Sequence, residues 1–218
     1  MATIFGLLMA PNARDARFPA GYVTARCFRC SMTQNIGILL FDRVEELDVV
    51  GPWEVLAAWT QQHPGDGFRV ATVSSGGSPV TCAKGMVLTP DYSFSSAPAW
   101  DVIVHPGGEG TEVLVKDEEH LDWVRSAAPL MTSVCTGSLV FAAAGLLTDR
   151  PATSHWATLE FLEVLDPTIE VRPDDRFVDD GDVITAAGVS AGIDMALHLV
   201  SRFAGSSRAA EIKHYIQY

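Results

Sequence analysis

Short, mainly apolar runs of strand length alternate with segments of helical periodicity along most of this chain, and this alternation strongly constrains the fold. The runs lie at residues 36–41, 68–73, 101–104 and 130–134, and helical patterns lie at residues 52–59, 118–127 and 137–144. Near-continuous apolar strands are typical of a sheet buried on both faces. The sequence therefore predicts an α/β fold, a mostly parallel sheet with helices on both faces, whose ligands bind beyond the carboxyl ends of the strands.

Antiparallel excursions and closing helices complete the predicted order of elements. Residues 86–94, behind Gly77-Ser78-Pro79, are expected to form a hairpin, and the Asp180-Gly181 turn predicts a second hairpin between residues 176–178 and 183–186. Residues 191–203 and 208–218 predict two helices. Because the last pattern is still helical at Tyr218, we expect the protein to continue past it or to end in a disordered tail.

Composition and charge exclude several classes of protein. The chain has 218 residues, 48% hydrophobic and 19% charged, as expected for a globular domain. With 27 acidic and 15 basic residues its formal net charge is −12, which argues against a nucleic-acid partner. No apolar run approaches the roughly 20 residues of a membrane-spanning helix, so a membrane protein is not expected. Four cysteines without the spacing of a disulfide framework favour a reducing compartment, the cytoplasm.

The first 31 residues differ from the remainder. They contain four arginines and one acidic residue, a composition that also allows a transit peptide. We interpret residues 1–31 as an extension, flexible or from a non-native start, with Met32 as an alternative initiator and residues 32–218 as the α/β domain. The Cys27-x-x-Cys30 motif could be half of a zinc site or a redox pair, but no second ligand pair follows it.

Cys135 is the candidate nucleophile. It follows the apolar run 130–134 and precedes a helix of small residues that starts near Gly137, so it is predicted at a sharp strand-to-helix turn. A helix N-terminus lowers the pKa of a thiol, which makes a better nucleophile at neutral pH. The alternative is a small, buried apolar residue.

Three other segments are expected near that thiol. Gly51-Pro52 predicts the helix entry and leaves Asp48 in the preceding loop, either as an N-cap or as a carboxyl with a raised pKa that moves a proton. The N–H groups of Gly107 and Gly108 either hold a developing negative charge or only form a turn. His155 is a candidate catalyst, pocket wall or subunit contact. The histidines show no metal-ligand spacing.

Taken together, these motifs resemble a known family. The resemblance rests on Leu47-Asp48, Gly51-Pro52, Pro106-Gly107-Gly108, Ser133-Val134-Cys135-Thr136-Gly137-Ser138, Ala152-Thr153-Ser154-His155-Trp156 and Ala191-Gly192-Ile193-Asp194, and it covers nearly all of residues 33–218. On these residues the chain resembles the ThiJ/PfpI branch of the class I glutamine-amidotransferase-like superfamily, and within it the members that hydrate isocyanides.

The resemblance implies a single flavodoxin-like domain, a homodimer, and hydration of an isocyanide to an N-substituted formamide without metal or cofactor. Cys135 would attack the terminal isocyanide carbon, and Asp48 would manage the proton and the water that resolve the thioimidate. Thr136 would support the site. The backbone at Gly188-Val189 would donate a hydrogen bond to sulfur.

Other branches fit less well. Protease-like members carry histidine where this chain has Thr136, and amidotransferases need a His-x-Glu that this sequence lacks. Members that act on glyoxals usually carry glutamate near the Leu47-Asp48 position, which disfavours a glyoxalase or stress-response role without removing it. Ligand-sensing domains of AraC-type regulators share the Cys-Thr-Gly and His-Trp patterns. A detached sensing domain therefore remains the alternative of a different class.

Overall fold

The strands predicted at residues 36–41, 68–73, 101–104 and 130–134 lie together in one central sheet. The computed structural model describes residues 33–218, so the proposed extension with Cys27 and Cys30 lies outside the described residues. Seven strands lie in the order β10, β11, β7, β6, β1, β2, β5, parallel except for β10 with β11. Their bounds are β1 Gln34–Leu39, β2 Phe68–Ser74, β5 Tyr92–Ser93, β6 Val102–His105, β7 Leu130–Val134, β10 Phe177–Asp179 and β11 Val183–Ala186.

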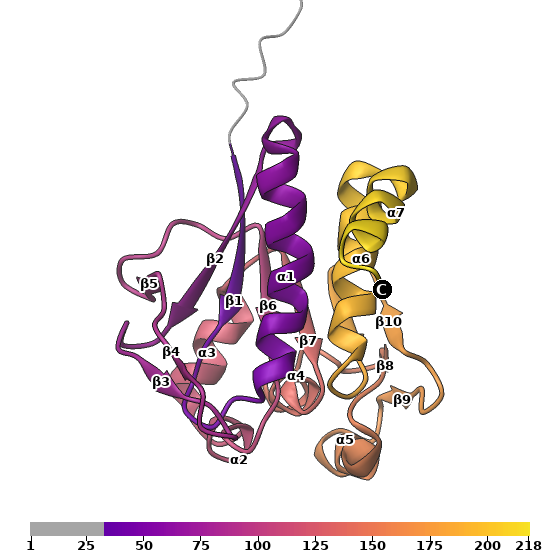
Figure 1. Cartoon of the computed structure of the whole chain (residues 1–218). Coiled ribbons are helices and arrows are strands. Elements are labelled where there is room, and N and C mark those ends of the chain that lie inside the picture. Colours follow the sequence, from indigo (N-terminus) through magenta and orange to yellow (C-terminus); the bar gives the residue numbers. More distant parts are fainter. Residues whose placement is uncertain (1–32) are drawn as a thin grey trace, which may run out of the picture. The chain divides into compact units, whose positions relative to one another are not determined.

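Helices cover both faces of this sheet (Figure 1). One face packs against α1 (Glu46–Gln62), α6 (Ala191–Ala204) and α7 (Ser206–Tyr215), and the other against α3 (Glu118–Ser126), α4 (Gly137–Ala143) and α5 (Leu159–Leu165). Neighbouring residues of β1 serve the two sides, because Ile38 belongs to the first core and Leu39 to the second. The predicted flavodoxin-like α/β sandwich is confirmed. None of the helices between residues 33 and 218 combines the length and apolarity needed to span a bilayer.

The smaller elements agree only in part with the prediction. The hairpin predicted within residues 86–94 was wrong in its bounds: β3 (Val80–Thr81) pairs with β4 (Val87–Leu88), and β5 extends the main sheet beside β2. The short helix α2 (Thr111–Leu114), the helix α5 and the pair β8 (Pro151–Ala152) with β9 (Glu170–Val171) were not predicted. Short 3-10 turns lie at Pro64–Asp66 and Trp156–Thr158. Elements this short carry too little periodicity to be recognised in a sequence.

The start of α1 differs from the prediction, which was wrong at this point. The helix begins at Glu46, so Pro52 lies inside it and Asp48 lies in its first turn, not in a preceding loop. Proline removes the N–H that would bond to the Asp48 carbonyl four residues earlier. The helix continues across this missing bond because Val49, Val55 and Leu56 are buried in the core on both sides of it. Packing thus outweighs the local signal of Gly51-Pro52.

Candidate active site

Cys135 lies at the sharp turn that the sequence predicts, directly after β7 and two residues before α4. Its φ of 57° is in the left-handed region, where a residue with a side chain is strained. The turn is held by its own amide, which donates to the carbonyls of Ala186 and Ala187 at 3.0 and 3.1 Å. Only 7% of Cys135 is exposed. This strained turn places a largely buried thiol at the carboxyl edge of the sheet.

Asp48 lies in the first turn of α1, at the same edge of the sheet as Cys135. The residue is fully buried, and its Oδ2 accepts a 2.9 Å hydrogen bond from the amide of Gly107. Its Oδ1 has no hydrogen-bond partner among the described residues. Burial raises the pKa of Asp48 to about 7, while the Gly107 amide and the nearby Cys135 thiol act against that rise. The carboxyl is therefore able to exchange a proton near neutral pH.

The thiol differs electrostatically from the sequence-based expectation. Burial and the adjacent Asp48 carboxylate raise the pKa of Cys135 to about 12, whereas hydrogen bonds from the backbone N–H groups of Thr136 and Val189 lower it. The expectation of a pKa lowered by the helix N-terminus was wrong, because desolvation and a buried negative charge outweigh the dipole of the seven-residue α4. At rest the sulfur carries its proton, and a base must remove it.

The two glycines after β6 pack against the nucleophile. A Cβ on Gly107 would lie 2.5 Å from the Thr136 nitrogen and 2.9 Å from the Cys135 Cβ, so no larger residue fits. Both amides, however, donate within the protein, Gly107 to Asp48 and Gly108 to Oγ1 of Thr136 at 2.9 Å. This differs from the expectation that they hold a developing charge. The backbone N–H groups that reach sulfur belong to Thr136 and Val189.

Thr136 links this glycine turn to the short helix α2. Its Oγ1 accepts hydrogen bonds from the Gly108 amide and, at 3.0 Å, from the Thr111 hydroxyl. The Thr111 hydroxyl also lies 2.7 Å from the Gly108 carbonyl. Thr111 was not among the predicted site residues, because nothing in its local sequence marks it.

His155 packs against the backbone beside the thiol. A Cβ on Gly188 would lie 2.3 Å from Cδ2 of His155, so the ring occupies the space that a side chain would need. The next residue, Val189, has a φ of 39°, a strained value for a β-branched residue. The Ser154 hydroxyl donates to the Cys135 carbonyl at 3.1 Å. His155 and Ser154 thus brace the two segments that surround the sulfur.

A cavity of about 670 Å³ opens on the thiol, a size suited to a small organic ligand. Apolar side chains form much of its wall, namely Val115, Leu139, Phe161, Val164, Leu165 and Val189. Cys135, Thr136 and His155 also line it, as does Glu45, which the sequence analysis did not single out. The Glu45 carboxylate pairs with Lys84 at 2.5 Å. Residues 33–218 contain no group of three side chains suited to hold a metal ion.

Comparisons with known proteins identify the family of this chain. Residues 34–202 match the DJ-1/PfpI family. The isonitrile hydratase of Pseudomonas putida is 41% identical over 191 residues, which are 86% of this chain and 79% of that protein. The HTH-type transcriptional regulator GbdR of Pseudomonas aeruginosa is 31% identical, but this chain spans only 51% of its length.

Solved structures lead to the same family. A THiJ/PfpI family protein from Pseudomonas syringae has a TM-score of 0.74 and 29% identity, with 93% of this chain and 82% of that chain covered. Together with the match over residues 34–202, these similarities establish the identity of the fold. The chain belongs to the DJ-1/PfpI family.

Proposed function

We propose that this chain hydrates isocyanides to N-substituted formamides, with Cys135 as the nucleophile. The observation that carries the proposal is the buried pair of Cys135 and Asp48, of which Cys135 lines an apolar cavity and Asp48 lies behind it as its side-chain partner. The 41% identity to the Pseudomonas putida isonitrile hydratase supports the choice of substrate. Isocyanides have a small reactive carbon and an organic substituent, which the apolar wall at Val115, Leu139 and Phe161 would accommodate.

The first step is addition of the thiol across the isocyanide carbon. As Sγ of Cys135 bonds to the terminal carbon, the thiol proton passes to the Asp48 carboxylate, which then delivers it to the same carbon. One S–H bond breaks, and one C–S and one C–H bond form, giving a thioimidate. The proton acceptor is needed because the buried thiol holds its proton at neutral pH.

The second step is hydrolysis of the thioimidate. Water adds to the carbon, and Asp48 accepts a water proton and returns one to the substrate nitrogen. The tetrahedral intermediate then breaks its C–S bond, and the remaining hydroxyl proton passes through Asp48 to sulfur as the formamide forms. The N–H groups of Thr136 and Val189 stabilise negative charge on the departing sulfur. Water and isocyanide are consumed in equal amounts, and the thiol is regenerated.

The test is formation of an N-aryl formamide from an aryl isocyanide such as 4-nitrophenyl isocyanide, followed by absorbance. Cys135→Ala should abolish turnover, and Cys82→Ala, which removes the other cysteine of the described chain, is the matched control and should retain it. Intact-mass analysis of the unaltered protein quenched during turnover should reveal a covalent adduct on Cys135, and Asp48→Asn should lack it because the proton acceptor of the first step is missing. Absence of turnover by the unaltered protein, or turnover by Cys135→Ala, would contradict the proposal.

A second candidate is a ligand-binding domain without turnover. It is supported by the 31% identity to the regulator GbdR, of which this chain spans about half the length. In that case the cavity beside Cys135 would bind its ligand equally well in Cys135→Ala, and no product would appear. Calorimetric titration of both forms, together with the formamide assay, separates the two candidates.

The finer assignments of assembly and compartment are also proposals. We propose a homodimer, because Phe161 and Val164 in the cavity wall are 56% and 77% exposed, Trp156 is 78% exposed, and a second copy would cover them. Sedimentation of Phe161→Asp, compared with Val87→Asp at an exposed position of β4 that does not line the cavity, tests this. We place the protein in the cytoplasm because Cys82 and Cys135 are both unpaired thiols.

A further inference from the structure

His105 is a fully buried histidine outside the cavity of the proposed site. It is the last residue of β6. Its ring packs between Phe41 and Phe141, with ring centres 5.6 and 5.8 Å away. An apolar side chain would fill that space as well. The polar ring therefore requires an explanation from its hydrogen bonds.

Both ring nitrogens of His105 have partners. Nδ1 lies 2.8 Å from the carbonyl oxygen of Pro106, and Nε2 lies 3.0 Å from Nε2 of His120. A carbonyl only accepts, so Nδ1 of His105 must carry the proton. Burial lowers the pKa of His105 to about 3 and that of His120 to about 4, so both rings are neutral near pH 7. Nε2 of His105 is then an acceptor, and His120 is its donor.

The chain of hydrogen bonds continues through one peptide group to Asp48. The carbonyl that His105 contacts belongs to Pro106, and the N–H of the same peptide is that of Gly107, which donates to Oδ2 of Asp48 at 2.9 Å. A hydrogen bond to a peptide carbonyl polarises the group and strengthens the bond that its N–H donates. His105 therefore acts on Asp48 without touching it.

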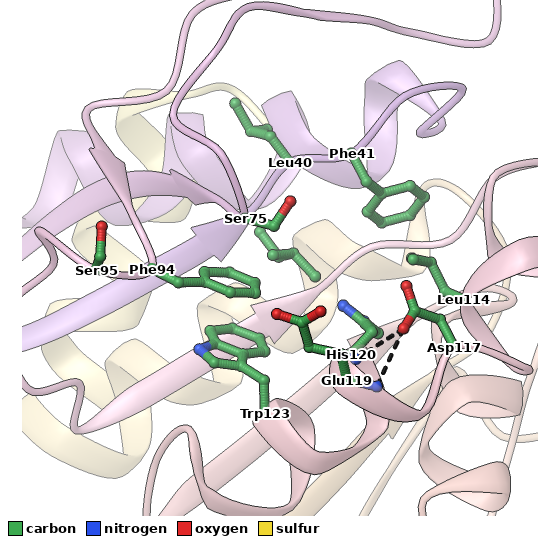
Figure 2. Close-up of a pocket in the computed structure, with 11 residues that line it drawn as sticks. Leu40, Phe41, Ser75, Phe94, Ser95, Leu114, Asp117, Glu119, His120 and Trp123 are labelled. Atoms are coloured by element: carbon green, nitrogen blue, oxygen red, sulfur yellow. Dashed lines mark hydrogen bonds between the residues drawn. The ribbon is translucent and has the colours of Figure 1, made fainter.

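The other end of this series of hydrogen bonds, at His120, reaches a second cavity of about 640 Å³ (Figure 2). His120 lines it from α3, beside Asp117, whose carboxylate caps that helix. Phe94 and Trp123 stack in the same wall, with ring centres 3.9 Å apart. His120 is thus held between this wall and the buried His105.

We propose that His105 is a positioning residue which, through the Pro106–Gly107 peptide, fixes the Asp48 carboxyl against Cys135, and that His120 fixes the tautomer of His105 that does so. This inference rests on the proposed function for the role of Asp48. Without His105 the Pro106 carbonyl loses a partner, and the Gly107 amide becomes a weaker donor. Asp48 would then hold its proton more tightly.

The other charged and titratable groups around this chain are few. Asp48 is influenced by Glu45, which raises its pKa, by Lys84, which lowers it, and by Cys135. Asp117 acts on His120 and opposes the effect of burial there. Glu45, Lys84 and Asp117 stay unchanged in the experiment below. The histidine substitutions therefore isolate the hydrogen-bond chain.

The experiment measures the rate of Cys135 alkylation by iodoacetamide between pH 5 and 9, with Cys135 followed by peptide mass spectrometry. Asp48 and Cys135 titrate as a pair, so the unaltered protein should show an inflection near pH 7, and Asp48→Asn should lack it. His105→Leu should move the inflection upward by about half a pH unit. His105→Asn, whose amide N–H can replace Nδ1–H, should restore it.

Thr132→Val is the control for general destabilisation. It removes a buried 2.9 Å hydrogen bond from Thr132 of β7 to the Ile103 carbonyl of β6, and Thr132 takes no part in the hydrogen bonds that link His120 to Asp48. If His105→Leu does not fold, His120→Phe tests the first link and should shift the inflection in the same direction. An inflection that moves no further than in Thr132→Val would overturn the proposal. So would a shift that His105→Asn does not reverse.

Turnover adds a separate readout. With an isocyanide substrate, His105→Leu should lower kcat several-fold with little change in KM, since His105 does not line the cavity beside Cys135. A shifted alkylation profile in a protein that turns over no isocyanide would refute the proposed function and retain the positioning role. Turnover with an unshifted alkylation profile would support the proposed function and overturn the positioning role of His105.

Discussion

Asp48 and Gly107, 59 positions apart in the sequence, are joined by a 2.9 Å hydrogen bond from the Gly107 amide to Oδ2 of a fully buried carboxyl. The same glycine accepts at its carbonyl from the Glu45 amide at 2.9 Å. The N–H and the carbonyl of Gly107 both bond to the start of α1, and these two bonds fix the turn after β6 to that helix. The position of the acid relative to the thiol depends on this connection, and the predictions below test its parts.

Gly107→Ala should damage both folding and turnover. The new Cβ would lie 2.5 Å from the Thr136 nitrogen, a backbone atom that cannot rotate away. We expect a loss of about 2 kcal/mol in the free energy of unfolding, and a loss of activity because the Gly107 amide moves away from Asp48. Urea denaturation and the formamide assay measure the two effects. Gly65→Ala, where a Cβ meets no atom within 4 Å, is the control and should change neither.

Thr136→Val tests the link between the glycine turn and α2. Valine has nearly the same shape but cannot accept the hydrogen bonds from the Gly108 amide and the Thr111 hydroxyl. An amide left unpaired in a half-buried site costs about 1–3 kcal/mol, so the thermal midpoint should fall. Thr136→Ser retains the oxygen and should stay near the unaltered protein. Valine keeps the methyl group and loses the hydroxyl, so an unchanged thermal midpoint in Thr136→Val, or a larger fall in Thr136→Ser than in Thr136→Val, would contradict the role of the hydroxyl.

Asp48→Asn should be more stable than the unaltered protein, and this difference should grow as pH rises. The folded-state pKa of Asp48 is raised from 3.8 to about 7, so between these values the folded protein binds the proton that the unfolded chain has lost. The free energy of unfolding of the unaltered protein therefore falls from pH 4 to 7 and levels off above that. Between pH 5.5 and 8 the advantage of Asp48→Asn should grow by about 2 kcal/mol. Glu54→Gln, on the exposed face of the same helix, is the control; an advantage independent of pH would contradict the raised pKa.

The pH dependence of isocyanide turnover should follow the same carboxyl. Since ionised Asp48 must take the thiol proton, kcat/KM should rise with pH through a midpoint near 7. Asp48→Asn should lower kcat by about 10²–10⁴-fold, the usual contribution of a general acid–base, and should lack the inflection. A rate that falls as Asp48 ionises would instead assign the protonated acid to the limiting step.

Local pattern determined much of this protein. The apolar run at residues 130–134 and the small residues after Cys135 were sufficient to place the cysteine at a strand-to-helix turn, because strand and helix periodicities are properties of neighbouring residues. Parallel strands then bring their carboxyl ends to one edge, which predicts that Asp48, Gly107 and Cys135 meet there. The Asp180-Gly181 turn likewise identified the hairpin of β10 and β11.

Only the tertiary structure decided how those groups behave. The helix α1 continues through Pro52 because its flanking residues are buried in the core, although the local sequence predicted that the helix starts at Pro52. The thiol pKa depends on desolvation and on a carboxylate far away in the sequence, and it moves in the direction opposite to that expected from the helix N-terminus. The hydrogen bonds that the Gly107 and Gly108 amides donate have acceptors far away in the sequence, and so does the hydrogen bond between His105 and His120. These bonds form only when the chain folds. Hydrogen-bond partners and dielectric surroundings arise from contacts between distant segments, so a local pattern does not contain them.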